Sequence, residues 1–292
     1  MSPDPFVRAE DLFGELTGLT APVILDASLV LHRPRFDGDF RTDSGHGAWY
    51  AAHVPGAIHV QVDSDLAFPA ATHNHHPPPQ ALAERLARFG IGPDTPTVVY
   101  DSTGGFWAAR VWYLLRWIGV PVRVLDGGLS AWRAAGLPLE SGATHVRPVA
   151  PWRAHPVRDA WIELDDLRGI DCGAGNLVCA LSPQAFWGKE PTRYTRRGHI
   201  PGSVNVPARE LFTDDGLIRP PAEITQRYRD AGTDLGREVI LYCGGGISAT
   251  VNALALAAAG VENVRVYDGS LEEWSADPTL PLLVGYSEGG RR

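Results

Sequence analysis

The chain has 292 residues, of which 44% are hydrophobic and 21% charged, and this length and composition predict a soluble protein with two domains. Its formal net charge of −8 at pH 7 lends no support to a nucleic-acid or membrane partner. The three cysteines are too few for a disulfide framework and favour a reducing compartment. Because the first ten residues lack the basic start and apolar run of a signal peptide, we expect a cytoplasmic protein.

Short apolar runs alternate with helical patterns along the chain. In the first half, strands are predicted at residues 23–25, 57–62, 97–100 and 122–125, and helices at residues 79–89 and 106–118. Such alternation is typical of an α/β fold in which a doubly wound, mainly parallel sheet is flanked by helices.

Three segments of the first half return in the same order in the second half. Residues 53–56 (HVPG) return as 199–202 (HIPG), residues 98–101 (VVYD) as 240–243 (ILYC), and the D-G-x-x-x-x-W segment 126–132 as 268–274. The repeated unit is about half of the chain, which indicates a duplicated domain. We expect the first copy at residues 1–141, a linker at 142–157 and the second copy at 158–292.

Cys243 stands where an apolar strand, residues 239–242, meets three glycines and then the start of a helix near Ser248. In open α/β folds, ligands bind at such carboxyl ends of strands. Glycines let successive backbone N–H groups point into the loop, and the helix N-terminus adds the positive end of its dipole, so the loop favours an anion. A cysteine there is expected to be a nucleophilic thiolate, and the alternative is a buried small side chain.

The two H-[IV]-P-G segments, the two D-G-x-x-x-x-W segments and the loop 243–249 (CGGGISA) make the chain resemble the two-domain rhodanese-type sulfurtransferases, the family of thiosulfate and 3-mercaptopyruvate sulfurtransferases. The resemblance covers nearly the whole chain. It implies two tandem rhodanese-like domains, of which only the second is catalytic, and Asp101 stands at the place of Cys243 in the first.

The same resemblance implies a reaction. Cys243 would take a sulfur atom from a small anionic donor as a persulfide and pass it to cyanide, a thiol or a thiol protein such as thioredoxin. The backbone N–H groups around the loop would stabilise the sulfur anions, and no metal or cofactor is implied. The residues that would bind the substrate through this loop are Gly244, Gly245, Gly246, Ile247 and Ser248.

The loop sequence also bears on the donor. Thiosulfate enzymes of the family commonly have cations directly after the cysteine, whereas Gly244 and Gly245 are neutral, which favours 3-mercaptopyruvate. That branch commonly has a serine at the position of Gly245, as part of a proposed serine–histidine–aspartate relay. Asp63 and His75 fall near the places of the other two members, so the relay implied here is incomplete. The alternative for residues 73–76 (HNHH) is a solvated loop, which we favour over a catalytic or metal-binding role.

The family commonly offers two arginines, before the second H-[IV]-P-G segment, that can bind the carboxylate of a donor. Ala185 stands where the first is expected, and Arg193 is close to the place of the second. Arg196 and Arg197 follow at once and could compensate for Ala185. The donor is therefore left open between 3-mercaptopyruvate and thiosulfate.

Three further side chains are candidates for the pocket. Phe186 and Trp187 lie in the segment that is expected to border the loop of Cys243. Cys179 ends a neighbouring strand, and one hypothesis makes it a resolving thiol that reacts with the persulfide, whereas the preferred alternative is a packed small side chain. A non-enzymatic alternative concerns the whole chain: a persulfide carrier or docking module that does not turn over.

Overall fold

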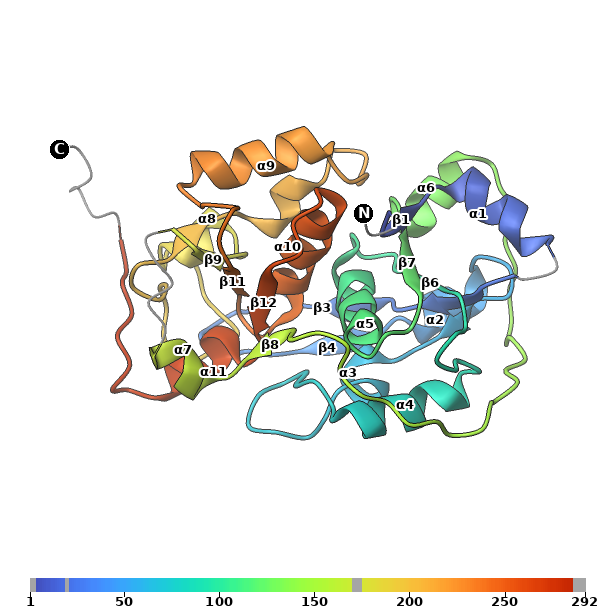
Figure 1. Ribbon diagram of the computed structural model, residues 1–292, viewed down its shortest axis with the longest axis horizontal. Helices are drawn as coiled ribbons and strands as arrows, with labels where there is room; N and C mark the ends of the chain where they lie inside the picture. Colours follow the sequence, from blue (N-terminus) through green and yellow to red (C-terminus); the bar gives the residue numbers. More distant parts are fainter. Residues whose placement is uncertain (1–3, 19–20, 170–174, 286–292) are drawn as a thin grey trace.

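The structure, a computed structural model, describes residues 4–18, 21–169 and 175–285, and Cys172 lies outside these ranges. Within them the chain forms two five-stranded sheets, one in each half of the sequence. Every pair of neighbouring strands in both sheets is parallel. The predicted α/β class, with two mainly parallel sheets flanked by helices, is therefore confirmed (Figure 1).

The two sheets have the same strand order. The first reads β1-β7-β6-β2-β5 and the second β8-β12-β11-β9-β10. The first sheet consists of β1 (Phe6–Val7), β7 (Val122–Leu125), β6 (Thr97–Tyr100), β2 (Val23–Asp26) and β5 (Ile58–His59). The second sheet consists of β8 (Trp161–Ile162), β12 (Val264–Tyr267), β11 (Val239–Tyr242), β9 (Leu177–Cys179) and β10 (Val204–Asn205). A separate antiparallel ribbon is formed by β3 (Leu29–Leu31) and β4 (Thr42–Ser44).

Helices connect the strands in both copies. The first copy has α1 (Ala9–Leu16), α2 (His46–Ala51), α3 (Val62–Asp65), α4 (Pro79–Arg88), α5 (Phe106–Trp117) and α6 (Gly128–Ala134). The second has α7 (Leu164–Gly169), α8 (Pro183–Phe186), the 3-10 helix η1 (Ala208–Leu211), α9 (Pro221–Asp230), α10 (Ile247–Ala258) and α11 (Ser270–Ala276). The predicted helices at 79–89 and 106–118 thus form within one residue of their expected ends.

One predicted strand is shorter than expected. The apolar run 57–62 predicts a single strand, but only Ile58–His59 pairs with β2, and α3 begins at Val62. The reason is a side chain further along the chain: the carboxylate of Asp65 accepts the backbone N–H of Gln61 at 2.8 Å. This bond satisfies a free N–H group at the start of a helix and so turns the chain out of the strand.

The two copies pack against each other through α5 and α10, which lie side by side in the middle of the molecule (Figure 1). Both helices are apolar on most of their surface, which is typical of a helix buried on all sides. One apolar cluster runs across the interface and contains Trp112 and Leu115 of α5 and Val251 and Leu254 of α10. Because α5 follows β6 and α10 follows β11, the loops at the ends of these two strands lie beside the interface.

Residues 142–157 contain no helix or strand. They are nevertheless held against the first copy, since the indole N–H of Trp152 donates to the carbonyl of Ile91 at 3.0 Å and the N–H of Val149 to that of Ala87 at 2.9 Å. These contacts attach the segment between the two sheets to the surface of the first.

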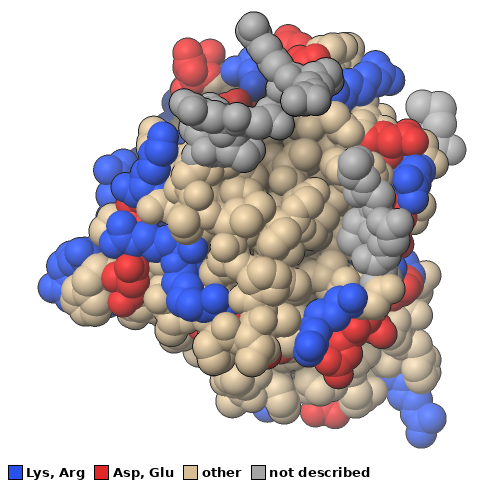
Figure 2. All heavy atoms as spheres, turned by 90° about the vertical axis from the view of Figure 1, so that its left-hand side faces the viewer, with Lys and Arg blue, Asp and Glu red and all other residues tan. Residues whose placement is uncertain are grey.

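Among the described residues, no helix is both long and apolar enough to cross a membrane. The end of the molecule that the second copy forms is mainly uncharged in the part described, with basic and acidic side chains mixed around its margin (Figure 2).

Candidate active site

Cys243 follows the central strand of the second sheet. β11 is buried along its whole length and ends at Tyr242, and α10 begins at Ile247, so Cys243 and the three glycines form the turn between them. The residue is buried, with 2% of its surface exposed. Gly246 has a φ of +76°, and a Cβ atom there would lie 2.5 Å from Oδ1 of Asp268, so only glycine fits this point of the turn.

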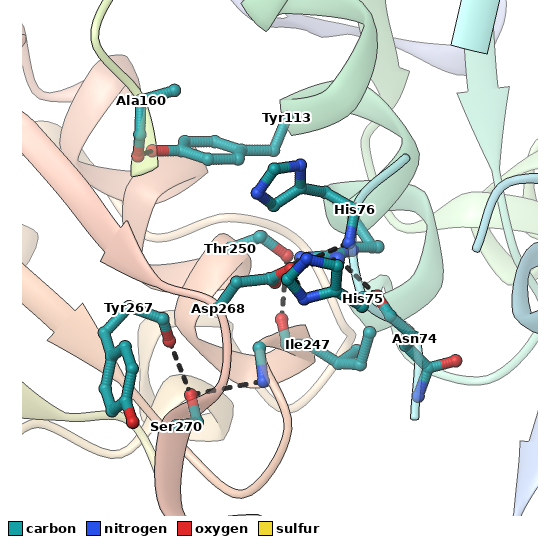
Figure 3. A network of polar contacts seen from close by, with 12 residues as sticks. Asn74, His75, His76, Tyr113, Ala160, Ile247, Thr250, Tyr267, Asp268 and Ser270 are labelled. Carbon is teal, nitrogen blue, oxygen red and sulfur yellow. Dashed lines mark hydrogen bonds and ion pairs between the residues drawn. The ribbon is translucent and has the colours of Figure 1, made fainter. Parts of the chain in front are cut away.

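Ser270 holds this turn from the side of α11. Its hydroxyl oxygen accepts the N–H of Cys243 at 3.0 Å and that of Gly246 at 3.3 Å. Its proton goes to the carbonyl of Tyr267 at 2.8 Å (Figure 3). Ser270 is fully buried and has a φ of +50°, a conformation that costs a non-glycine residue about 1–3 kcal/mol. The serine is therefore kept in strain at the point where it fixes the backbone of Cys243.

Sequence reasoning missed Ser270, although the repeat contained a signal. The corresponding residue of the first copy is Gly128, which has a φ of +56°, and a Cβ atom there would lie 2.4 Å from the carbonyl of Asp101. Both residues have a positive φ, which favours glycine. A serine at such a position indicates that its side chain has a specific role there. The backbone of α11 adds two further bonds, from Leu271 N–H to the carbonyl of Cys243 and from Glu272 N–H to that of Gly244, at 3.1 and 2.7 Å.

The first copy contains a related turn, one residue longer, with an anion already in it. The carboxylate of Asp101 accepts the backbone N–H groups of Thr103, Gly105 and Ala108 at 2.7, 2.9 and 2.9 Å. Gly105 and Gly246 each stand directly before the following helix with a left-handed φ, of +84° and +76°, so the two turns do not match residue by residue. The N–H groups of Gly245 and Ile247 have no acceptor within the parts of the chain that the structure describes. They are thus open to an anion on Cys243, whereas the N–H of Gly246 already donates to Ser270.

Arg193 and Tyr194 border the turn from the segment before the second H-I-P-G. The guanidinium of Arg193 donates to the carbonyl of His32 of the first copy at 2.6 and 3.1 Å. Burial lowers the pKa of Arg193, against the opposing effect of Glu190, Tyr194 and Cys243. A Cβ atom on Gly244 would lie 3.4 Å from the ring of Tyr194, whose hydroxyl is buried without a hydrogen bond to any described residue.

Arg196 and Arg197, the two candidates to compensate for Ala185, are bound elsewhere. Arg196 donates to the backbone carbonyls of Ser275 and Asp277 at 2.8 and 2.6 Å and also to that of Leu280. The guanidinium of Arg197 forms an ion pair with Asp37 of the first copy at 2.9 Å. Both side chains therefore tie segments of the protein together.

Phe186 and Trp187 pack against His199. The ring of Phe186 stacks on that of His199 with their centroids 3.8 Å apart, and the edge of Trp187 packs against Phe186 at 4.8 Å. Phe186 shares an apolar cluster with Cys179 and Tyr194, whereas Cys243 belongs to the other cluster of the second copy. The aromatic side chain that contacts the glycine turn is thus Tyr194.

Cys179 lies next to β11, opposite Tyr242 in the register of the sheet. It is fully buried, and burial raises the pKa of its thiol to about 12, so that it stays protonated at neutral pH. Since the thiolate is the reactive form, this environment disfavours the resolving role and agrees with a packed small side chain.

The interpretation of residues 73–76 as a solvated loop is wrong. The N–H groups of His73 and His76 donate to the carboxylates of Glu272 and Asp268 at 3.1 and 2.8 Å, and the carbonyl of Asn74 accepts Arg110 at 2.5 Å. Asp268 and Glu272 come from the end of β12 and from α11, whereas Arg110 belongs to α5 of the first copy, so the loop is docked on the second copy, beside Asp268 and the start of α10 at Ile247 (Figure 3). Local sequence could not reveal this docking, because the acidic partners lie almost two hundred residues away.

Docking of this kind occurs twice, once on each copy. The N–H of His76 donates to Asp268, and the N–H of Ile218 donates at 2.8 Å to Asp126, the residue at the place of Asp268 in the first copy. Each copy thus uses the aspartate of its D-G-x-x-x-x-W segment to bind a loop of the other.

The relay members implied by the resemblance do not meet. The carboxylate of Asp63 accepts hydrogen bonds from Thr42 and Gln61 at 2.9 and 2.7 Å, and no hydrogen bond joins it to His75 among the described residues. The imidazole of His75 lies 3.6 Å from the carboxylate of Asp268 instead.

His75, His76 and Asp268 offer three potential metal ligands whose atoms lie within 4.8 Å of one another. However, the guanidinium of Arg110 donates to both oxygens of Asp268, at 2.6 and 3.3 Å, and both residues are buried. A metal ion would have to compete with this guanidinium for the same carboxylate, so we assign no metal to these side chains.

Comparison with known proteins shows the family to which the chain belongs. The rhodanese-like domain matches residues 35–135 and 188–277. The chain is 35% identical over 285 residues to "Putative thiosulfate sulfurtransferase SseB" of Mycobacterium tuberculosis, covering 96% of both chains. It is 33% identical to "Probable 3-mercaptopyruvate sulfurtransferase" of Pseudomonas aeruginosa, over 90% of this chain and 92% of the relative. The crystal structure of SseA from Escherichia coli, a 3-mercaptopyruvate sulfotransferase, matches with a TM-score of 0.78 and 29% identity, over 92% and 99% of the two chains.

Proposed function

Because the chain belongs to the rhodanese-like family, we propose that it is a sulfurtransferase that moves a sulfane sulfur from a small anionic donor to a thiophilic acceptor through a persulfide on Cys243. The observation that carries this proposal is the comparison of the two turns. Asp101 keeps a carboxylate against the N–H groups of its own turn, and the second copy has, after the same central strand, a turn one residue shorter with a cysteine in place of the anion.

The chemistry follows from this arrangement. The Cys243 thiolate attacks the outer sulfur of the donor, a sulfur–sulfur bond forms, and the donor leaves with the electron pair of the bond that breaks. A second nucleophile then takes the sulfur and returns the thiolate, so ping-pong kinetics are expected. The N–H groups of Gly245 and Ile247, which have no acceptor among the described residues, would stabilise the charge on the persulfide.

The donor we propose is 3-mercaptopyruvate or thiosulfate. The neutral residues Gly244 and Gly245 favour the singly charged carboxylate of 3-mercaptopyruvate, and Arg193 is a cation close enough to Cys243 for their charges to interact. A small thiol, cyanide or a thiol protein such as thioredoxin would serve as acceptor. The free thiols of Cys179 and Cys243 support a reducing compartment such as the cytoplasm.

We also propose that the two halves of the chain have different roles. Residues 1–141 form the inactive copy, 142–157 the linker and 158–292 the catalytic copy. The first copy nevertheless contributes to the site, since the carbonyl of His32 binds Arg193 and the loop 73–76 docks beside the turn.

The alternative is a persulfide carrier or docking module of the same fold. It is favoured by Ala185, which removes an expected donor-binding arginine, and by Gly245, which removes an expected serine. Steady-state assays decide between the two: thiosulfate with cyanide, and 3-mercaptopyruvate with a thiol acceptor, each for the wild type and Cys243→Ser. An enzyme turns over many times with at least one pair and loses this activity in the variant. A carrier takes up one sulfur per molecule and then stops with both.

A further inference from the structure

Gly245 leaves a space beside Cys243, and the carboxylate of Glu272 fills it. A Cβ atom on Gly245 would lie 3.0 Å from Oε2 of Glu272. The backbone N–H of Glu272 donates to the carbonyl of Gly244 at 2.7 Å, so the start of α11 is bound directly to the turn. The Glu272 side chain is largely buried, with 16% of its surface exposed. The carboxylate of Glu272 therefore lies at the edge of the turn, in the space that a side chain at position 245 would occupy.

His73 of the first copy completes a pair with this carboxylate. Its backbone N–H donates to Oε1 of Glu272 at 3.1 Å, and its ring nitrogen Nδ1 forms a close ion pair with the same oxygen. The ring is stacked on Phe40, with the centroids 3.7 Å apart and an interplanar angle of 12°. About half of the His73 side chain is exposed, so the imidazole joins the buried carboxylate to solvent.

We propose that Glu272 and His73 are the proton-transfer pair of this site. Glu272 gives a proton to the carbon whose bond to sulfur breaks in an α-keto thiol donor, and His73 positions Glu272 and returns a proton to it. The inference rests on the proposed function. When the Cys243 thiolate attacks the sulfur of 3-mercaptopyruvate, the sulfur–sulfur bond forms and the carbon–sulfur bond breaks. The electron pair stays on the carbon as the enolate of pyruvate, and one proton must be added there to give pyruvate. Thiosulfate leaves as sulfite and needs no such proton.

The other acidic side chains at the same interface fit this task less well. Asp268 is held as a carboxylate by Arg110, and its second oxygen also accepts the N–H of His76. Glu163 is 63% exposed and pairs with His76 at 3.8 Å. Burial raises the pKa of the Glu272 carboxyl, against the hydrogen bonds and charge of His73. A carboxyl poised in this way is suited to general acid catalysis.

The test separates the two donors in single-turnover persulfide formation, followed by rapid quench and mass analysis of the protein. In Glu272→Gln, we expect the rate with 3-mercaptopyruvate to fall by about 10²-fold, because a general acid contributes at least this much. The rate with thiosulfate should stay close to that of the wild type. His73→Gln should slow the 3-mercaptopyruvate reaction in the same donor-selective way. The control is Glu163→Gln, which removes an acid from the same interface and should leave both rates unchanged.

An equal loss with both donors, or no loss with 3-mercaptopyruvate in Glu272→Gln, would overturn the proposal, since a merely structural role does not distinguish the donors. The result is also separable from failure of the proposed function. If the wild type forms no persulfide on Cys243 with either donor, the sulfurtransferase assignment itself fails. If it reacts with both donors and only the donor selectivity of the variants is missing, the assignment stands and the proton-transfer pair is rejected.

Discussion

Asp101 accepts three backbone N–H groups of its own turn, at the position that Cys243 occupies in the second copy. Both residues directly follow the central strand of their sheet, β6 in one copy and β11 in the other. The duplication has thus kept a turn at this place, one residue shorter in the second copy, and has placed a different side chain at its start. In the first copy the anion is part of the protein, and in the second we propose that the substrate brings it.

Replacement of Asp101 should lower the stability of the protein without lowering its activity. In Asp101→Ala, three N–H groups lose their acceptor, and only that of Ala108 is fully buried. Because an unsatisfied buried group costs about 1–3 kcal/mol, we expect the free energy of unfolding to fall by roughly 2 kcal/mol. The rate of sulfur transfer per folded molecule should remain close to that of the wild type. Chemical denaturation and a turnover assay on the same sample measure both. A strong loss of turnover without loss of stability would mean that the first turn takes part in the reaction.

The strained serine gives a second prediction. Ser270→Ala keeps the unfavourable φ of +50° and removes the acceptor of two N–H groups, so we expect a loss of about 2 kcal/mol in stability and slower persulfide formation. Ser270→Gly removes the same acceptor but relieves the backbone, as Gly128 does in the first copy. Its melting temperature should therefore exceed that of Ser270→Ala, while its rate stays equally low. A full rate in Ser270→Gly would show that the hydroxyl does not position Cys243.

The buried ion pair between Arg110 and Asp268 predicts an acid-sensitive interface. Burial works to raise the pKa of Asp268, but the charge and hydrogen bonds of Arg110, together with His76, hold it below the usual value of 3.8. A carboxyl with a lowered folded pKa contributes stability that is present above the unfolded pKa and is lost as the pH falls through the folded one.

Asp268→Asn tests this contribution, because it leaves a buried guanidinium without its counterion. We expect a loss of about 3–5 kcal/mol in unfolding free energy near pH 7. The difference from the wild type should shrink below about pH 4, where Asp268 begins to lose its charge in the unfolded chain. A difference that does not depend on pH would contradict the electrostatic explanation and point to packing alone.

Arg193 and Arg197 are expected to differ in their effect on the donor. Arg193 is partly buried near Cys243, whereas Arg197 forms an exposed ion pair with Asp37. If Arg193 binds the donor anion, Arg193→Gln removes a charged hydrogen bond worth about 2 kcal/mol, and KM should rise roughly 30-fold with a smaller change in kcat. Arg197→Gln removes a contact between the same two copies and should leave KM nearly unchanged, since exposed pairs contribute about 1 kcal/mol or less. Equal effects of the two variants would assign Arg193 to the interface only.

The comparison of sequence and structure shows which features a local pattern can predict. The repeat predicted the two sheets and the shared position of Asp101 and Cys243, because both depend on short segments whose order is retained. The family match confirmed the resemblance. The role of Ser270 depends on a backbone angle, and only the contrast with Gly128 hinted at it.

Contacts between the copies could not be predicted in this way. The partners of residues 73–76 are Asp268 and Glu272, which reach them only when α5 and α10 pack together. The sequence did not predict that Phe186 stacks on His199 and that Trp187 meets it edge-on, since the direction of a side chain in a short turn depends on tertiary packing. Arg196 likewise binds carbonyl groups at the end of α11 and beyond it.

The central claim is that Cys243 carries the transferred sulfur, and peptide-level mass spectrometry after a single exposure to donor tests it most directly. We expect the mass of one additional sulfur atom on the peptide that contains Cys243, in the wild type and in Cys179→Ala, and its absence in Cys243→Ser. Cys179 should remain unmodified in the folded protein, because it is buried and its pKa is raised to about 12. Sulfur found on Cys179 or Cys172, or retained by Cys243→Ser, would contradict the account.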